Sequence, residues 1–245
     1  MKTAFHMPEE QQRAQTLQAL RQLCRGAALV SAEERPRLST GIPALDGLLP
    51  GRGLECGSLV EWLVPVDGSG AASLALQGVR PALQRRAVWA VIDPAGEFHS
   101  PAVQGWGISL DSLLLLRPVS IADTAWTVEQ CLRCAAVGVT WIQMETLPDR
   151  VLQRWKIAVE TGGGVGVLFR PARARRQASW ADVRWLVEPR PNAASPGRRV
   201  RVELLACRGS CAGGAVELDV NDATGDVRLV SAVADPTTAL RAAGA

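Results

Sequence analysis

The residues best placed to do chemistry form a turn, Gly68-Ser69-Gly70, between an apolar run at 58–63 and a run of small residues. A buried strand, a glycine turn and a helix in that order is the layout of a loop that cradles nucleotide phosphates. In a working loop the last glycine precedes a Lys that reaches the β and γ phosphates, and then a Ser or Thr that holds Mg²⁺. In this chain those two positions are Ala71 and Ala72.

The two alanines remove the groups that neutralise charge during phosphoryl transfer. Loss of the Lys costs a charge-assisted contact of about 1.5–3 kcal/mol, which lowers nucleotide affinity by about one to two decades. Loss of the hydroxyl removes a metal ligand. The sequence therefore predicts a protein that is not an ATPase and has no nucleotide cofactor. An ordinary turn is the alternative interpretation of the segment.

Motifs upstream of the turn favour a degraded phosphate loop over an ordinary turn. Ser39-Thr40-Gly41, then Leu45-Asp46, then a glycine-rich stretch at 51–57 precede the apolar run. Their order and spacing resemble the approach to the phosphate loop in the RecA recombinase family. More narrowly, the chain resembles the ImuA family, RecA-like accessory proteins of a bacterial mutagenesis cassette, whose loop is often degraded as Pro65 to Gly70 is here. Segments 202–209 and 216–219 resemble the terminal strand pair of that family.

The same resemblance marks two vestigial catalytic positions. Glu97 is the nearest match to the RecA glutamate that activates water, but the spacing is longer and Pro94 intervenes. Glu145 stands where RecA has an aspartate linked to magnesium. Neither carboxylate is expected to work without Lys and Thr in the loop. The alternative is that both are polar strand ends at the rim of a domain.

The elements that must position these residues alternate along the chain. Strands are predicted at 58–63, 87–92, 112–116, 139–144 and 164–169, with helices at 70–84, 100–105, 121–136 and 149–160. Continuous apolar strands suit a mainly parallel sheet covered on both faces. Runs at 182–188, 198–206, 214–220 and 226–230 predict later, partly antiparallel strands, with a hairpin at 221–226. The predicted fold class is α/β, with a RecA-like core, flanking helices and antiparallel C-terminal strands.

Length and composition fit one compact core. With 245 residues and 47% hydrophobic content, the chain can bury a single α/β core. The expected organisation is an N-terminal helix and linker at 1–36, the core at 37–230 and a tail at 231–245. No apolar run reaches about 18 residues, and the N-terminus carries no signal-peptide pattern, so we expect a cytoplasmic protein without a membrane segment.

The six cysteines raise the question of a metal site. Cys131 and Cys134 are spaced to share one helix face, and Cys207 and Cys211 flank a strand end, but neither pair has a nearby His at ligand spacing. Reduced thiols and no bound metal are expected for an intracellular chain.

Two surfaces are candidates for partner contacts. Residues 170–201 contain nine arginines against two acids, a balance of +7 in a chain of net charge +3. Arg170, Arg173, Arg175 and Arg176 stand where RecA has its second DNA-binding loop; they predict a protein-docking surface or a weak single-stranded DNA contact, with a solvated face as the alternative. The second candidate is an apolar stripe on the N-terminal helix at 8–24, formed by Leu17, Leu20 and Leu23.

The family resemblance implies a non-catalytic scaffold in SOS-associated, error-prone translesion DNA synthesis. Its implied partners are an ImuB-type inactive Y-family polymerase homologue, a C-family error-prone polymerase and RecA. A RecA-derived inhibitor of cell division, of the SulA type, is a second reading. A weak DNA-dependent ATPase is a third, which would require Glu97 and Glu145 to act despite Ala71 and Ala72.

Overall fold

The computed structural model describes residues 35–66, 68–86, 88–192, 197–209, 213–221 and 225–233. The N-terminal helix predicted at 8–24, with Leu17, Leu20 and Leu23, lies outside these residues, as does the tail from residue 234.

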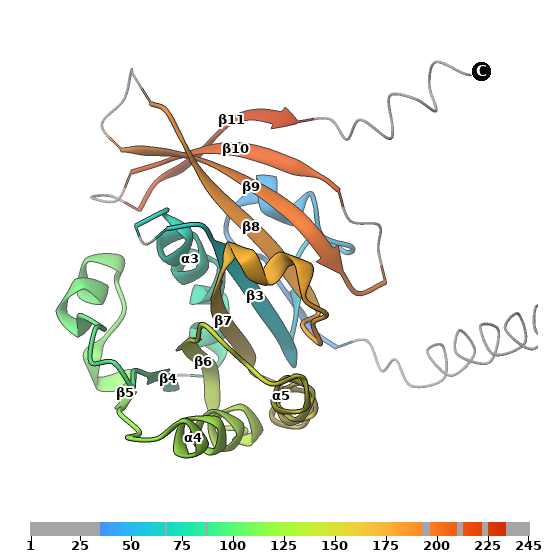
Figure 1. The fold of residues 1–245 in the computed structure, drawn as a ribbon. Coiled ribbons are helices and arrows are strands. Elements are labelled where there is room, and N and C mark those ends of the chain that lie inside the picture. Colours follow the sequence, from blue (N-terminus) through green and yellow to red (C-terminus); the bar gives the residue numbers. More distant parts are fainter. Residues whose placement is uncertain are drawn as a thin grey trace, which may run out of the picture. The chain divides into compact units, whose positions relative to one another are not determined.

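The central element is a sheet that has nine strands within the described residues (Figure 1). Their spatial order is β11-β10-β9-β8-β3-β7-β6-β4-β5. The bounds are β3 Ser58–Val64, β4 Val88–Ile92, β5 Leu113–Leu116, β6 Val137–Gln143, β7 Val165–Pro171, β8 Val183–Arg190, β9 Arg198–Cys207, β10 Ala215–Val220 and β11 Val227–Val233. Strands β1 (Arg37–Leu38) and β2 (Leu54–Glu55) form a separate short antiparallel pair.

Strand direction divides the sheet into two parts. Strands β5, β4, β6, β7, β3 and β8 pair in parallel, whereas β8, β9, β10 and β11 pair antiparallel. This arrangement confirms the predicted fold class. The inner parallel strands are mostly buried and largely apolar, as expected for a parallel sheet covered on both faces.

Helices cover the two faces of the parallel part (Figure 1). The helix α3 (Ala71–Arg85) and the short α2 (Pro43–Asp46) pack with one apolar cluster of the sheet. The helices α4 (Ile121–Arg133) and α5 (Asp149–Gly162) pack with the cluster on the opposite face. Ser120 caps the N-terminus of α4, and its hydroxyl accepts a hydrogen bond from the Asp123 backbone N–H. Gly163, with φ of 72°, caps the C-terminus of α5.

The helix predicted at 100–105 is a 3₁₀ helix, η1 (Ser100–Trp106). Pro101 lies in its first turn and Gly107 adopts a left-handed conformation at its end, so the segment is stopped before a longer α-helix can form. Of two further 3₁₀ helices, η2 (Leu110–Ser112) lies directly before β5 and η3 (Ala172–Arg176) directly follows β7.

The antiparallel strands have one apolar and one charged face. Val200, Val202 and Leu218 are buried on the face that joins the core with α3. The opposite face carries cross-strand ion pairs, among them Arg199 with Asp219 at 2.7 Å. The hydrogen bond from the Arg199 guanidinium holds the pKa of Asp219 below its ordinary value. Alternation of this kind is what an antiparallel sheet with one uncovered face requires.

Candidate functional site

The glycine turn before α3 has the backbone of a phosphate loop without its side chains. Gly70 precedes the helix with φ of 90°, a conformation that favours glycine. The side chain of Arg198, on β9, lies over the turn, and its guanidinium donates to the Gly68 carbonyl. A Cβ added to Gly70 would lie 2.8 Å from the Arg198 Cδ and 3.2 Å from Val200. Strand β9 therefore covers the side of the turn at Gly70.

The two alanines lie in the first turn of α3 in different environments. Ala71 is buried in the core and Ala72 is exposed beside the cavity described next. Ser69 is buried as well. The turn thus presents no Lys amine and no hydroxyl from the two positions that would hold phosphate and Mg²⁺.

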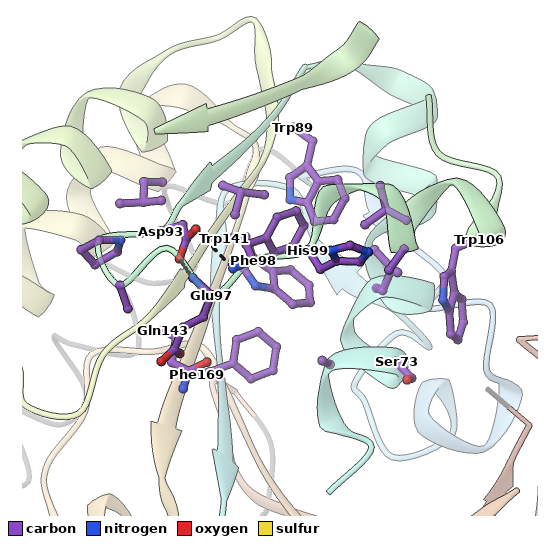
Figure 2. Close-up of a pocket in the computed structure, with 18 of the residues that line it drawn as sticks. Ser73, Trp89, Asp93, Glu97, Phe98, His99, Trp106, Trp141, Gln143 and Phe169 are labelled. Atoms are coloured by element: carbon purple, nitrogen blue, oxygen red, sulfur yellow. Dashed lines mark hydrogen bonds between the residues drawn. The ribbon is translucent and has the colours of Figure 1, made fainter. Parts of the chain in front are cut away.

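A cavity of about 560 Å³ lies between α3, η1 and the carboxyl ends of β4, β6 and β7 (Figure 2). Its walls carry five aromatic side chains: Trp89, Phe98, Trp106, Trp141 and Phe169. Ring centroids are 5.6 Å apart between Trp89 and Phe98, 5.6 Å between Trp89 and Trp141, and 4.6 Å between Trp141 and Phe169. The size and the apolar walls are those of a binding pocket.

Polar groups with acidic character line the remainder of this cavity. They are Ser73, Asp93, Glu97, His99, Gln143 and Glu145, and the part of the chain that the structure describes adds no Lys or Arg to the lining. The indole N–H of Trp89 is buried and has no hydrogen-bond partner. A buried donor without an acceptor is costly in a finished interior. Among the described residues that line it, the cavity therefore offers three carboxylates on its walls, while the Trp89 N–H lies behind its surface.

Asp93 organises the loop that closes one side of the cavity. Its carboxylate accepts hydrogen bonds from the backbone N–H groups of Glu97, at 2.9 Å, and Phe98, at 3.2 Å. Arg117 contacts the same carboxylate at 3.4 Å. These contacts set the position of Glu97 and Phe98, as Figure 2 shows. Sequence reasoning gave Asp93 no role, although Asp before Pro-x-Gly is a turn signal that indicates such a cap.

We expect replacement of Asp93 by alanine to cost about 1–3 kcal/mol of unfolding free energy, because two backbone donors lose their acceptor. Urea unfolding followed by circular dichroism measures this. Asp111, an exposed carboxylate at the start of η2, is the matched control, and Asp111→Ala should stay within about 0.5 kcal/mol. Equal stability of the two variants would show that the Asp93 contacts do not hold the loop.

The other predicted acidic position, Glu145, lies at the exposed rim of the cavity. Its side chain is 80% exposed and pairs with Arg173 at 2.9 Å. Glu97 is also exposed, and within the described residues its carboxylate has no ion pair. Both carboxylates border the aromatic cavity, as their strand ends predict, but they line it together with aromatic rings and not with a Lys and a hydroxyl.

Arg170 was predicted to lie on the basic contact surface, and the structure shows that it is buried. It is 2% exposed, and its guanidinium donates to the Glu61 carboxylate at 2.9 Å. Arg184 binds the other oxygen of Glu61, which is itself fully buried. The guanidinium of Arg170 is therefore committed to the interior and is not available to a partner. The alternating pattern of β7 places this residue on the face below η3, where Glu61 is its counter-ion.

The remaining three arginines of the segment, Arg173, Arg175 and Arg176, are exposed on η3. This short helix is anchored by Ala174, which packs with Leu63 and Leu186. Its geometry leaves a small basic surface, with Arg173 directed to Glu145 at the cavity rim. Trp180, further along, is partly exposed and donates to Asp149 at 3.0 Å.

The described cysteines are free thiols: Cys56, Cys131, Cys134 and Cys207. Burial, and secondarily the nearby Cys134, raises the pKa of Cys131 to about 11, which makes this thiol unreactive. Among residues that the structure describes, no group of three or more His, Cys, Asp or Glu side chains is arranged to hold a metal. No helix in the same part of the chain is both long and apolar enough to cross a membrane.

Comparisons with known proteins bear on the family and on the fold. No protein-family model matches the chain. Protein ImuA from two strains of Caulobacter vibrioides is 29% identical over 233 residues, which span 85% of this chain and 95% of that protein. Protein RecA from Rhodopirellula baltica is 32% identical over 102 residues, 42% of this chain and 27% of that protein. The crystal structure of the RadB recombinase superimposes with a TM-score of 0.61 at 17% identity, covering 79% of this chain and all of that one; it shows the fold.

Proposed function

This chain belongs to the ImuA family, and we propose that it acts as a non-catalytic scaffold in SOS-associated, error-prone DNA synthesis across lesions. The coarser role, that of a RecA-like accessory protein, follows from the family and the fold. The finer role assigns it to a cytoplasmic complex with an ImuB-type inactive polymerase homologue, a C-family polymerase and RecA.

The glycine turn before α3 is the observation that carries the non-catalytic part of this proposal. Ala71 and Ala72 replace the cation and the metal ligand, and Arg198 from β9 lies over Gly70. The carboxylates of Glu97 and Glu145 remain at the edge of the sheet without those groups. Electrostatic stabilisation and positioning supply nearly all catalysis of phosphoryl transfer. This edge of the sheet lacks the charges for ATP hydrolysis, and its role in the proposal is to bind a partner.

We expect the purified protein to hydrolyse ATP no faster than a buffer blank, with or without single-stranded DNA. The missing Lys and hydroxyl leave the transition-state charge without neutralisation. Release of inorganic phosphate, with an active RecA protein assayed in parallel, measures the rate. Turnover above the blank that disappears in the Glu97→Gln variant would contradict the scaffold role.

A gain-of-function pair sharpens the same test. Ala71→Lys with Ala72→Thr restores the two missing groups in sequence, and Arg198→Ala in the same background clears the side chain over the turn. We expect at most a recovery of nucleotide binding, measured by calorimetry, and no hydrolysis, because Glu97 lies among aromatic rings at the cavity wall. Recovery of turnover in the triple variant would show that these three residues are enough to separate this chain from an ATPase.

The partner assignment is tested by co-expression. Tagged protein should co-purify with the ImuB-type homologue from cells whose DNA has been damaged, and deletion of the gene should reduce damage-induced mutagenesis. Retention of full mutagenesis after deletion would contradict the role in lesion bypass, whereas arrest of cell division on overproduction would favour an inhibitor of the SulA type.

A further inference from the structure

The aromatic cavity has the opposite charge from a phosphate site. Its walls carry Asp93, Glu97 and Glu145, and no Lys or Arg lines it among the residues that the structure describes. Asp93 and Glu145 each have an arginine partner, Arg117 and Arg173, whereas Glu97 has none within the described residues. A phosphate entering here would meet uncompensated negative charge, and a cationic group would be attracted.

The walls suit a planar cation in particular. Trp89, Trp141 and Phe169 form a connected set of largely buried rings. Phe98 and Trp106 are partly exposed in the same wall, and exposed aromatic faces attract a guanidinium by cation–π interaction and stacking. A guanidinium also matches a carboxylate with two parallel hydrogen bonds.

The cavity continues into a second hollow of about 400 Å³ at the same edge of the sheet. The two hollows share Pro94, Gln143 and Glu145 as lining residues. The far wall of the second hollow carries Val119 and Ile121, which are 97% and 76% exposed. The two hollows and the exposed side chains of Val119 and Ile121 together form one groove. Exposed apolar side chains of this kind mark surfaces that contact a partner.

We propose that this groove, from the aromatic cavity to Val119 and Ile121, binds a short basic and apolar segment of a partner protein. An arginine of the segment enters the cavity and faces Glu97, and an apolar side chain packs on Val119 and Ile121. Buried arginines and aromatic contacts are the groups that carry most of the energy in protein interfaces. The inference rests on the scaffold role and names the chemistry of one partner contact.

The test uses two capped tripeptides, acetyl-Leu-Arg-Leu-amide and its citrulline analogue, which keeps the shape of arginine without its charge. Protein labelled with ¹⁵N at tryptophan is titrated, and the indole N–H resonances are followed. We expect shifts concentrated at Trp89, Trp106 and Trp141 among the eight tryptophans, with the arginine peptide bound about tenfold more tightly, equivalent to about 1.4 kcal/mol.

Two variants separate the charge from the apolar contact. Glu97→Gln should weaken the arginine peptide several-fold and leave the citrulline peptide unchanged. Val119→Ser should weaken both peptides alike. Glu188→Gln, on the charged face of β8, is the matched control and should leave both affinities as in the wild type. All three side chains are partly or fully exposed, so folding is expected to survive each change.

Equal affinity for the arginine and citrulline peptides would overturn the proposal, as would the absence of indole shifts at the highest soluble peptide concentration. Tighter binding of adenosine monophosphate or of oligodeoxythymidylate at the same indoles would also overturn it, in favour of a nucleotide or DNA site. These results are independent of the scaffold role, which fails on ATP turnover or on unchanged mutagenesis after deletion of the gene.

Discussion

Replacing Glu61 with alanine is expected to destabilise the protein by about 3–5 kcal/mol, because it leaves two buried guanidinium groups without their counter-ion. Glu61 is fully buried on β3, and Arg170 and Arg184 bind its two carboxylate oxygens. A loss of that size is a large part of the stability of an ordinary domain. Chemical unfolding monitored by tryptophan fluorescence measures this loss of unfolding free energy. A variant that does not fold at all, seen as loss of the protein from the soluble fraction, would also agree with a loss of this size.

The matched control for Glu61 is Glu145, which also pairs with an arginine but at the surface. Exposed ion pairs contribute about 0–1 kcal/mol, so Glu145→Ala should unfold almost as the wild type does. A Glu61→Ala variant within about 1 kcal/mol of the wild type would mean that water reaches the two arginines after the substitution, and the buried network would then have no stabilising role.

The same network positions η3. The Arg184 guanidinium donates to the Ala174 carbonyl at 2.9 Å and to the Gln177 carbonyl at 3.2 Å, and Arg170 donates to the Gln177 side chain. The ends of the basic segment are therefore tied to the interior. This is why Arg170 must be left intact in any test of what the segment binds.

Replacing Arg173, Arg175 and Arg176 together with alanine is expected to weaken co-purification with an acidic partner by about tenfold or more, since each decade corresponds to only about 1.4 kcal/mol. Three exposed charges on one short helix act mainly on steering and on rim contacts. Stability should change little, because all three side chains are exposed. Pull-down from damaged cells, with unfolding curves of the same variant, gives both readouts.

The control for the basic segment is a matched triple change on the charged face of the antiparallel strands: Arg190, Arg199 and Arg201 to alanine. Single-stranded DNA binding distinguishes the other possible role. If the segment contacts phosphates, the log–log slope of affinity against salt should flatten by about 0.7 for each contact removed. Salt-sensitive DNA binding lost in the Arg173, Arg175 and Arg176 variant, with co-purification intact, would overturn docking in favour of DNA.

Much of the fold could be predicted from local sequence. The apolar runs at 58–63, 139–144 and 164–169 are parallel strands in the structure, with ends shifted by only a few residues. The runs from 198 onward alternate between apolar and charged residues, and they form the antiparallel strands. The helix predicted at 100–105 differs in type because Pro101 and Gly107 act within a segment too short for an α-helix to gain from its periodicity.

For the candidate site, the sequence predicted which groups are missing but not how the remaining side chains are arranged. The sequence by itself determined which groups the glycine turn lacks, because Ala71 and Ala72 cannot supply a cation or a metal ligand in any conformation. It also determined that Glu97 and Glu145 lie near one edge, since the carboxyl ends of parallel strands meet there. These are properties of residue type and strand direction, which local patterns carry.

Only the tertiary structure decided which charges are buried and which rings meet. Glu61 and Arg170 are paired although they lie on separate strands, and Arg198 reaches the glycine turn from β9. The rings of Trp89, Trp141 and Phe169 come from three strands that become neighbours when the sheet assembles. The physical reason is that burial and pairing depend on which strands lie side by side. An arginine in a basic run has the same sequence pattern whether its guanidinium is solvated by water or paired with a buried carboxylate.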